Sequence, residues 1–502
     1  MGTRRHARRL LGPWIALTLA LTTLPAAGLV DAPVVHAATV IRPRIPGIAP
    51  LSREVYGYLP YWRLDVGTVD RINYDLVSTI AIFGLGIKAD GNLDTAWVGY
   101  REYIGDDAAA VTNAAHDRGV RVVPTFQLFD SGALPKLTAF LGSAAAQSRF
   151  IAQALALMAD RQADGANLDF EPMPEAQTAA YLAFVSHFRA AMKARFPGST
   201  LVNATSAGAG SALIAGLVPL VDRQLIMTYN YRWSGSTVTG AIAPLDHAAR
   251  NVKLHIARIL QWAPAGTVLL GVPYYGYDWP VTSAVPNATV QSNKTTFGAV
   301  TSVTYASARD FLAAHPSARR YDALEGSGFY TYWDPVKRTL RQVYFEEERS
   351  LNDKYDYAIV TGLAGVGIWT LDNDRGYTEL WDLLRTKFYA PVRRASVGAA
   401  VKRVTRTAGS VYATISYSAR NTGTVPLRGL WRWVVRDARG RAVARGTRVA
   451  ETIYPGRVVI HGVKIRLGLA IRLRAGSYTV RVDFGSTAAR WVSPSVAFRQ
   501  RY

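Results

Sequence analysis

Short apolar runs alternate with helical patterns along most of this 502-residue chain. Runs of strand length occur at residues 55–59, 76–83, 120–126, 165–170, 200–205, 224–229, 268–273 and 365–369. Between them apolar residues recur with helical spacing, as in residues 106–117, 143–162 and 175–195. Helices between successive strands imply parallel pairing and right-handed crossovers. The pattern therefore predicts an α/β fold, a (β/α)8 TIM barrel over residues 53–390.

Two regions depart from this alternation. Residues 282–342, between the seventh and eighth predicted strands, are mixed and strand-rich, which predicts an α+β insertion there. Residues 391–502 show short alternating runs separated by turn signals and no helical period. That spacing predicts a C-terminal all-β sandwich of immunoglobulin-like type. The proline-rich residues 38–52 are expected to form a linker.

The first 37 residues have the pattern of a signal peptide. Four arginines precede an apolar run that Pro13 and Pro25 interrupt, and Val35-His36-Ala37 fits a small-residue cleavage site. We therefore expect bacterial-type export, with a secreted or wall-associated product. Attachment to a membrane is the alternative if the leader stays uncleaved. The chain has no cysteine, which excludes disulfides and thiolate catalysis.

A polar ladder ends the fourth predicted strand. Alternation along a strand places Asn167, Asp169 and Glu171 on one face, roughly 6.5–7 Å apart, with Leu168 and Phe170 on the other. Polar groups on an inward face are costly unless they are hydrogen-bonded or work at a site. The sequence therefore predicts a site here, while spacing alone leaves a solvated acidic turn open.

Aromatic and amide residues follow the other predicted strands at the same end of the barrel, where catalytic groups of such barrels lie. Rings stack on the C–H faces of sugars, and sugar hydroxyls need polar partners. Any one of these rings could equally be core. Their recurrence favours a sugar site; they include Tyr58, Gln127, Asn203, Tyr229, Asn230, Tyr275 and Trp369.

The sequence resembles glycoside hydrolase family 18, the chitinase and N-acetylglucosaminidase family, over roughly residues 53–390. The segment Asp164-Gly-Ala-Asn167-Leu-Asp169-Phe-Glu171 is similar to the Asp-Gly-x-Asp-x-Asp-x-Glu signature of that family. Three further segments match in the same order: Tyr56-Gly-Tyr58, Met227-Thr-Tyr229-Asn230 and Gly365-Val-Gly-Ile-Trp369. The resemblance is greatest to the branch of spore- and wall-associated peptidoglycan N-acetylglucosaminidases.

This resemblance implies roles for the site residues. Glu171 would be the general acid and base, Asp169 would orient the substrate acetamide group, and Tyr229 would donate to the acetamide oxygen. The acetamide group itself would be the nucleophile. Trp369 would form the floor of the sugar pocket. The remaining expected substrate-binding residues are Tyr58, Gln127, Asn167, Asn203, Asn230 and Tyr275.

The sequence departs from the family pattern at three points. Asn167 replaces the central aspartate of the signature, and Asn230 stands where aspartate usually follows the tyrosine. A Ser-x-Gly-Gly motif of the third strand is absent, with residues 125–129 in its place. These differences weaken a plain chitinase reading and leave open a lectin-like barrel that binds glycans without cutting them. The retained Glu171 argues against that alternative.

We therefore expect retaining hydrolysis of β-1,4 bonds after N-acetylglucosamine in peptidoglycan. The enzymatic alternative is chitin as substrate, and the alternative from another class is a non-catalytic adhesion protein. The expected partner is an N-acetylated polysaccharide. No metal cluster or phosphate-binding glycine loop is evident, so neither metal nor cofactor is expected.

The positive charge of the chain is concentrated at its C-terminal end. Residues 391–502 hold 22 lysines and arginines against three acids, a net charge of +19 out of +22 for the whole chain. Arginine accounts for all but two of these basic residues and suits bidentate contact with phosphate or carboxylate. The domain is expected to attract anionic wall polymers rather than nucleic acid, although a merely solvated basic surface remains open.

Overall fold

The computed structural model describes residues 39–45, 50–390, 392–423, 425–454, 456–469, 475–486 and 489–500. The predicted signal peptide lies outside these residues. Among the helices of the described part, none is both long and apolar enough to cross a membrane.

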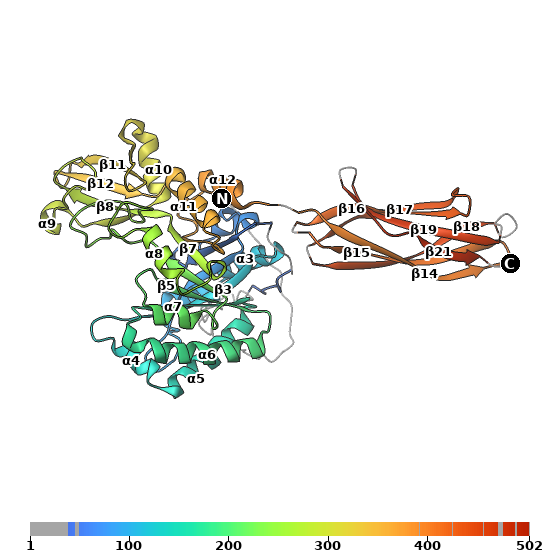
Figure 1. The fold of residues 1–502 in the computed structure, drawn as a ribbon, viewed down its shortest axis with the longest axis horizontal. Coiled ribbons are helices and arrows are strands. Elements are labelled where there is room, and N and C mark those ends of the chain that lie inside the picture. Colours follow the sequence, from blue (N-terminus) through green and yellow to red (C-terminus); the bar gives the residue numbers. More distant parts are fainter. Residues whose placement is uncertain are drawn as a thin grey trace, which may run out of the picture. The chain divides into compact units, whose positions relative to one another are not determined.

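Eight parallel strands close into a barrel in the order β1-β13-β7-β6-β5-β4-β3-β2 (Figure 1). The predicted TIM barrel is therefore confirmed. Its strands are β1 (Glu54–Pro60), β2 (Thr79–Gly86), β3 (Arg121–Phe129), β4 (Gly165–Glu171), β5 (Thr200–Ser206), β6 (Arg223–Met227), β7 (Val268–Pro273) and β13 (Gly365–Trp369).

Helices connect these strands and cover the outside of the barrel (Figure 1). They are α1 (Thr68–Arg71), α2 (Val98–Ile104), α3 (Asp106–Asp117), α4 (Pro135–Leu141), α5 (Ala144–Asp160), α6 (Thr178–Arg195), α7 (Ser211–Leu217), α8 (Val252–Ile259), α11 (Glu348–Val360) and α12 (Glu379–Phe388). Short 3-10 turns are η1 (Tyr61–Arg63), η2 (Tyr74–Leu76), η3 (Glu175–Gln177), η4 (Ala265–Thr267) and η5 (Pro316–Ala318).

Side chains fill the interior of the barrel. A buried cluster inside it includes Tyr56, Val123, Val202, Leu225 and Leu269, each contributed by a different strand. Gly367 of β13 makes room for this layer, since a Cβ there would lie 2.2 Å from Leu225 Cδ1. The packed interior leaves only the strand ends free to form a site.

The insertion between β7 and β13 is a five-stranded antiparallel sheet with the order β10-β11-β12-β8-β9. It begins at Tyr275 and ends at Phe345, so it extends beyond the expected residues 282–342 at both ends. Tyr275 therefore belongs to the insertion and not to the end of a barrel strand. Its elements are β8 (Tyr275–Val281), α9 (Lys294–Phe297), β9 (Thr301–Thr304), α10 (Tyr305–Ala314), β10 (Arg320–Asp322), β11 (Ser327–Asp334) and β12 (Thr339–Phe345).

The C-terminal region forms two antiparallel sheets around its own core, as predicted (Figure 1). Inward residues such as Ile415, Trp431, Val435 and Val480 are fully buried. One sheet contains β14 (Ala395–Arg406), β15 (Ser410–Asn421) and β18 (Val458–Leu469). The other contains β16 (Leu427–Asp437), β17 (Ala442–Ile453), β19 (Gly476–Gly485), β20 (Arg490–Val492) and β21 (Val496–Gln500).

Part of the expected linker is fixed to the barrel. The backbone N–H of Arg42 donates to Asn113 of α3 at 2.7 Å, and the carbonyl oxygen of Arg42 lies 2.6 Å from His116 Nδ1. Arg44 pairs with Asp164, the first residue of the signature, at 2.6 Å. Asp164 therefore anchors the start of β4, at the opposite end of the strand from Glu171.

Candidate active site

The polar ladder lies on the inward face of β4. Asn167 is fully buried and Asp169 nearly so, while Glu171 at the end of the strand is partly exposed. The alternate residue Phe170 faces the helices, where its ring packs against Phe184 at a centroid distance of 5.6 Å. The alternation predicted from the sequence therefore places the carboxyl groups at the mouth of the barrel. The peptide bond between Glu171 and Pro172 is cis.

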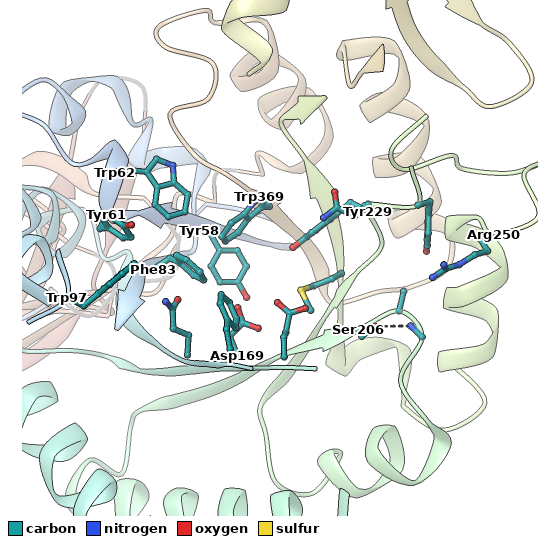
Figure 2. Close-up of a pocket in the computed structure, with 18 residues that line it drawn as sticks. Tyr58, Tyr61, Trp62, Phe83, Trp97, Asp169, Ser206, Tyr229, Arg250 and Trp369 are labelled. Atoms are coloured by element: carbon teal, nitrogen blue, oxygen red, sulfur yellow. Dashed lines mark hydrogen bonds between the residues drawn. The ribbon is translucent and has the colours of Figure 1, made fainter. Parts of the chain in front are cut away.

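A cleft of about 540 Å³ opens above this ladder (Figure 2). Predicted site residues that line it are Tyr58, Gln127, Asp169, Glu171, Tyr229, Asn230 and Trp369. They come from β1, β3, β4, β13 and the segment after β6, so the ends of five strand units meet at one cavity. A cleft with apolar walls and a few convergent polar groups is the usual form of a small-molecule or glycan site.

Trp369 lies at the centre of an aromatic cluster in this cleft (Figure 2). Its ring centroid is 4.8 Å from that of Phe83, 5.3 Å from Tyr58 and 6.4 Å from Trp62. All three contacts are edge-to-face, with interplanar angles of 84°, 65° and 71°. This geometry holds the indole in one orientation, so it can present a fixed flat face to a ligand.

Burial controls the ionisation of the two carboxyl groups. Desolvation, and secondarily the charge of Glu171, hold the pKa of Asp169 well above its ordinary value. Desolvation also raises the pKa of Glu171. Within the described residues Asp169 Oδ1 has no hydrogen-bond partner. A proton is therefore retained more readily here than on an exposed carboxylate, which a general acid at neutral pH requires.

Tyr229 reaches the same cleft from the segment after β6. Gly271 of β7 permits this approach, because a Cβ there would lie 3.0 Å from the Tyr229 ring and 2.3 Å from the carbonyl oxygen of Ile226. Burial, followed by the charges of Asp169 and Glu171, raises the pKa of the Tyr229 hydroxyl well above its ordinary value. The hydroxyl therefore stays protonated and available as a donor.

Asn167 lies beneath the cleft and does not line it. Its amide oxygen accepts a hydrogen bond from Tyr58 at 3.4 Å, and its amide nitrogen donates to Thr125 at 3.4 Å. The neutral side chain thus ties β4 to β1 and β3 below Asp169. Asn167 is therefore positioned to support the cleft and not to contact a ligand.

Two other predicted residues lie outside the cleft. Asn203 faces the helices, where it accepts a hydrogen bond from Tyr181 of α6, because the inward positions of β5 are the even-numbered ones. Tyr275 lines an adjoining hollow of about 210 Å³ and donates to Asn230 Oδ1 at 2.5 Å. Asn230 lines both cavities, and the Tyr275 ring also packs edge-to-face against Tyr229 of the cleft, with ring centroids 6.5 Å apart.

The sequence did not single out several residues that line the cleft. Trp97, Ala207, Gly208 and Arg250 lie on loops, whereas Phe129 and Ser206 are the last residues of β3 and β5. Trp97 and Phe129 keep 43% and 41% of their surface exposed, an unusual degree for large rings. Arg250 follows β6 by more than 20 residues, and no motif marks it.

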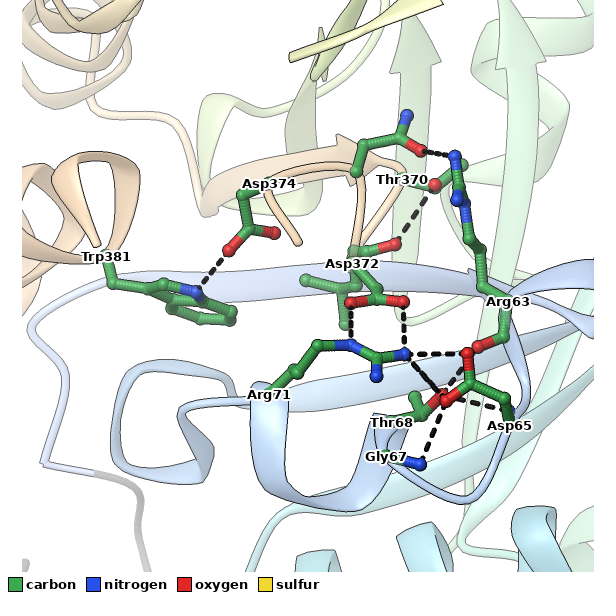
Figure 3. Close-up of polar contacts among 11 residues, drawn as sticks. Arg63, Asp65, Gly67, Thr68, Arg71, Thr370, Asp372, Asp374 and Trp381 are labelled. Atoms are coloured by element: carbon green, nitrogen blue, oxygen red, sulfur yellow. Dashed lines mark hydrogen bonds and ion pairs between the residues drawn. The ribbon is translucent and has the colours of Figure 1, made fainter. Parts of the chain in front are cut away.

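A partly buried polar network holds the loop that follows Trp369 (Figure 3). Arg71 donates to both carboxylate oxygens of Asp372, at 2.6 and 2.9 Å, and also to Asp65 at 2.9 Å. Arg63 donates to Asn373 at 2.8 Å, and Trp381 donates to Asp374 at 2.7 Å. The loop after β13 is thereby joined to the segment after β1, so the two walls around Trp369 are fixed together.

The donor sets in the described residues do not suggest a metal centre. No group of three or more histidine, aspartate or glutamate side chains in that part of the chain is placed to hold an ion.

Residues 129–374 match the family model of Glycosyl hydrolases family 18. The barrel domain belongs to glycoside hydrolase family 18. The matched residues include Glu171, Tyr229 and Trp369, and the domain is a glycosidase domain related to spore cortex-lytic enzymes and chitinases.

Individual relatives agree with this assignment. The chain is 25% identical to the putative sporulation-specific glycosylase YdhD of Bacillus subtilis, over 70% of this chain and 82% of the relative. It is 24% identical to the cortical fragment-lytic enzyme of Bacillus anthracis, over 49% and 55%. The structure matches a family 18 chitinase of Cycas revoluta with a TM-score of 0.57 and 18% identity, covering 67% of this chain and 99% of the chitinase.

Proposed function

We propose that this protein hydrolyses β-1,4 bonds after N-acetylglucosamine in peptidoglycan or a closely related wall glycan. The observation that carries the proposal is the position of Glu171 and Asp169 on one face of β4, inside an aromatic cleft that also holds Tyr229. Two carboxyl groups with burial-raised pKa values beside a protonated hydroxyl can perform acid–base chemistry on a bound sugar.

The reaction would proceed with the acetamide group of the substrate as nucleophile. Glu171 protonates the leaving glycosidic oxygen while the acetamide oxygen attacks the anomeric carbon. Asp169 accepts a hydrogen bond from the acetamide nitrogen and stabilises the positive charge that develops on it. Tyr229 donates to the acetamide oxygen and orients it. Glu171 then removes a proton from water, whose oxygen attacks the anomeric carbon. The bond between that carbon and the acetamide oxygen breaks, which regenerates the N-acetyl group and restores the original configuration.

Arg250 favours an acidic wall glycan over chitin as the substrate. In Figure 2 Arg250 and Ser206 lie on one side of Asp169, and Tyr61 and Trp97 lie on the other. Within the described residues no carboxylate pairs with Arg250, whose guanidinium carbon lies 5.7 Å from the centre of the Tyr231 ring. Peptidoglycan carries carboxylates on its sugars and peptides, whereas chitin is neutral. A guanidinium at one end of the cleft complements the former.

We also propose export and attachment to the wall. The support is the basic start, apolar run and cleavage pattern of residues 1–37, together with the basic charge of the C-terminal domain. Fractionation of producing cells tests this proposal. Protein in the wall or medium that begins after Ala37 supports it, and full-length protein confined to the cell interior contradicts it.

The enzymatic proposal is tested with the wild type and Glu171→Gln on purified peptidoglycan and on chitin oligomers. New reducing ends from peptidoglycan with the wild type only are the expected result. Glu175→Gln, a nearby exposed glutamate outside the cleft, is the matched control and should keep full activity. Activity on chitin alone would contradict the choice of substrate. If the protein binds the glycans but cleaves neither of them, it is a glycan-binding protein and not an enzyme.

A further inference from the structure

The five-stranded sheet of the C-terminal domain presents arginines on its outer face. Along β16, Trp431 and Val435 are buried in the core, so the alternate residues Arg428, Arg432 and Arg436 face outward. Eight residues of strand separate the first and last of these arginines, a length of roughly 26 Å. They form a line along the centre of the sheet, because β16 pairs with β17 on one side and with β19 on the other.

Neighbouring strands add arginines beside this line. Val434 lies opposite Arg445 of β17 and opposite Arg481 of β19, so two arginines flank the gap between Arg432 and Arg436. On β21, Arg499 lies opposite Ser477, another outward residue of β19. We call this surface the arginine face; its members are Arg428, Arg432, Arg436, Arg445, Arg481 and Arg499.

The charge of the arginine face is largely uncompensated. Arg432 lies 3.4 Å from Asp483, but within the described residues no carboxylate pairs with Arg428, Arg445 or Arg481. The other two acids of the domain are occupied elsewhere: Asp437 pairs with Arg441, and Glu451 accepts from Trp431 and His461. Like charges on adjacent strands lower stability, so a bound polyanion would relieve a repulsion that the fold itself leaves in place.

We propose that the arginine face binds a linear polymer with a phosphate in each repeat unit. A guanidinium presents a planar fork of donors that matches phosphate, and it stays charged at any physiological pH. The elongated array offers successive contacts to an extended chain, which suits a polymer better than a single anion. This site lies in a different domain from the catalytic cleft, and the proposal does not depend on the glycosidase activity.

The test uses the full chain and end-labelled linear polyphosphate, with binding followed by fluorescence anisotropy over a range of salt concentrations. The triple variant Arg428→Gln/Arg445→Gln/Arg481→Gln should lower the affinity at low salt by at least about tenfold. It should also reduce the slope of log affinity against log salt by about 2, since each of the three lost phosphate contacts contributes about 0.7 to that slope for a single-stranded polyanion. Thermal unfolding checks that the variant is folded.

A charge-matched control comes from the other sheet of the same domain. Arg403→Gln/Arg420→Gln/Lys464→Gln removes three exposed charges from β14, β15 and β18 and should weaken binding less than about threefold. A third variant, Arg428→Lys/Arg445→Lys/Arg481→Lys, keeps the charge and should bind with intermediate affinity. Equal losses in both glutamine triples would overturn the proposal, because net charge alone would then explain binding. Tighter binding to duplex DNA or to anionic lipid vesicles at equal phosphate concentration would also overturn it.

Discussion

Arg71 and Asp372 are joined by two hydrogen bonds, at 2.6 and 2.9 Å, although 301 positions separate them in the sequence. Asp372 is buried and follows Trp369 by three residues, while Arg71 belongs to the helix that follows β1. The pair therefore connects the first and last strand units of the barrel directly behind the aromatic cluster.

Breaking this pair should destabilise the protein and loosen the cleft. Arg71→Gln leaves the carboxylate of Asp372 buried without its partner, which we expect to cost about 3 kcal/mol of unfolding free energy. Because Trp369 shares that loop, KM for glycan should rise more than kcat falls. Thermal or denaturant unfolding and steady-state kinetics measure the two effects. The control is Arg118→Gln, whose partner Asp75 is half exposed, with an expected cost under about 1 kcal/mol. A similar loss in both variants would contradict the special role of Arg71.

Asp169 should lower stability at neutral pH. Its folded-state pKa lies well above that of an unfolded aspartate, so the folded protein binds this proton more tightly than the unfolded chain does. Its contribution to stability is therefore complete below about pH 4 and is lost as the pH rises through the folded-state pKa. Asp169→Asn removes the titration and should be more stable than the wild type at pH 7 by about 1–3 kcal/mol, with little difference at pH 4. Unfolding curves at the two pH values decide this, and a less stable variant at pH 7 would refute it.

Asn167 should set the pH range of the reaction. In Asn167→Asp a second carboxyl group lies about 6.5–7 Å from Asp169 on the same strand face, and like charges raise carboxyl pKa values further. The acid–base transitions in a plot of kcat/KM against pH should therefore move upward. Asn167→Ala adds no charge and serves as the comparison. An unchanged or downward-shifted profile in the aspartate variant would show that the ladder is not electrostatically coupled.

Arg250 should determine the preference for acidic glycans. Arg250→Gln removes a charge-assisted hydrogen bond worth about 1.5–3 kcal/mol, so the ratio of kcat/KM for carboxylate-bearing over neutral glycan should fall about tenfold or more. Arg195→Gln changes the same charge at the end of α6, outside the cleft, and should leave the ratio as in the wild type. With the wild type, esterifying the carboxylates of the acidic glycan should lower its kcat/KM to that of the neutral glycan. If Arg250→Gln has the same ratio of kcat/KM values as the wild type, Arg250 does not select the substrate.

The polar ladder at the carboxyl-terminal end of β4 could be predicted because strand alternation and local sequence agree there. Asn167, Asp169 and Glu171 share one face only if the segment is a strand, and Leu168 and Phe170 supply the apolar face that such a strand needs. Asn203 shows the limit of the same reasoning. Both faces of its strand mix apolar with polar residues, so the sequence does not reveal which alternate set points inward.

Two of the cleft residues that were missed lie where periodicity carries no information. Trp97 and Arg250 reach the cavity from long loops, whose paths depend on tertiary contacts rather than on local pattern. In the C-terminal domain the sequence of β17 carries little strand signal for a related reason: half of its residues are exposed and only Ile453 is buried, so it lacks the apolar alternation that marks a strand. The strand conformation of β17 comes from its backbone pairing with β16, which its own sequence does not indicate.

The basic residues of the C-terminal domain are almost all arginines, so polymer binding and glycan cleavage should respond to different solution conditions. Guanidinium groups keep their charge throughout the physiological pH range, whereas Glu171 and Asp169 titrate. Attachment through the arginine face would therefore respond to ionic strength and cleavage to acidity. If both proposals hold, a change in pH silences cleavage while the protein stays bound to its polymer, and salt releases the protein without changing its catalytic competence.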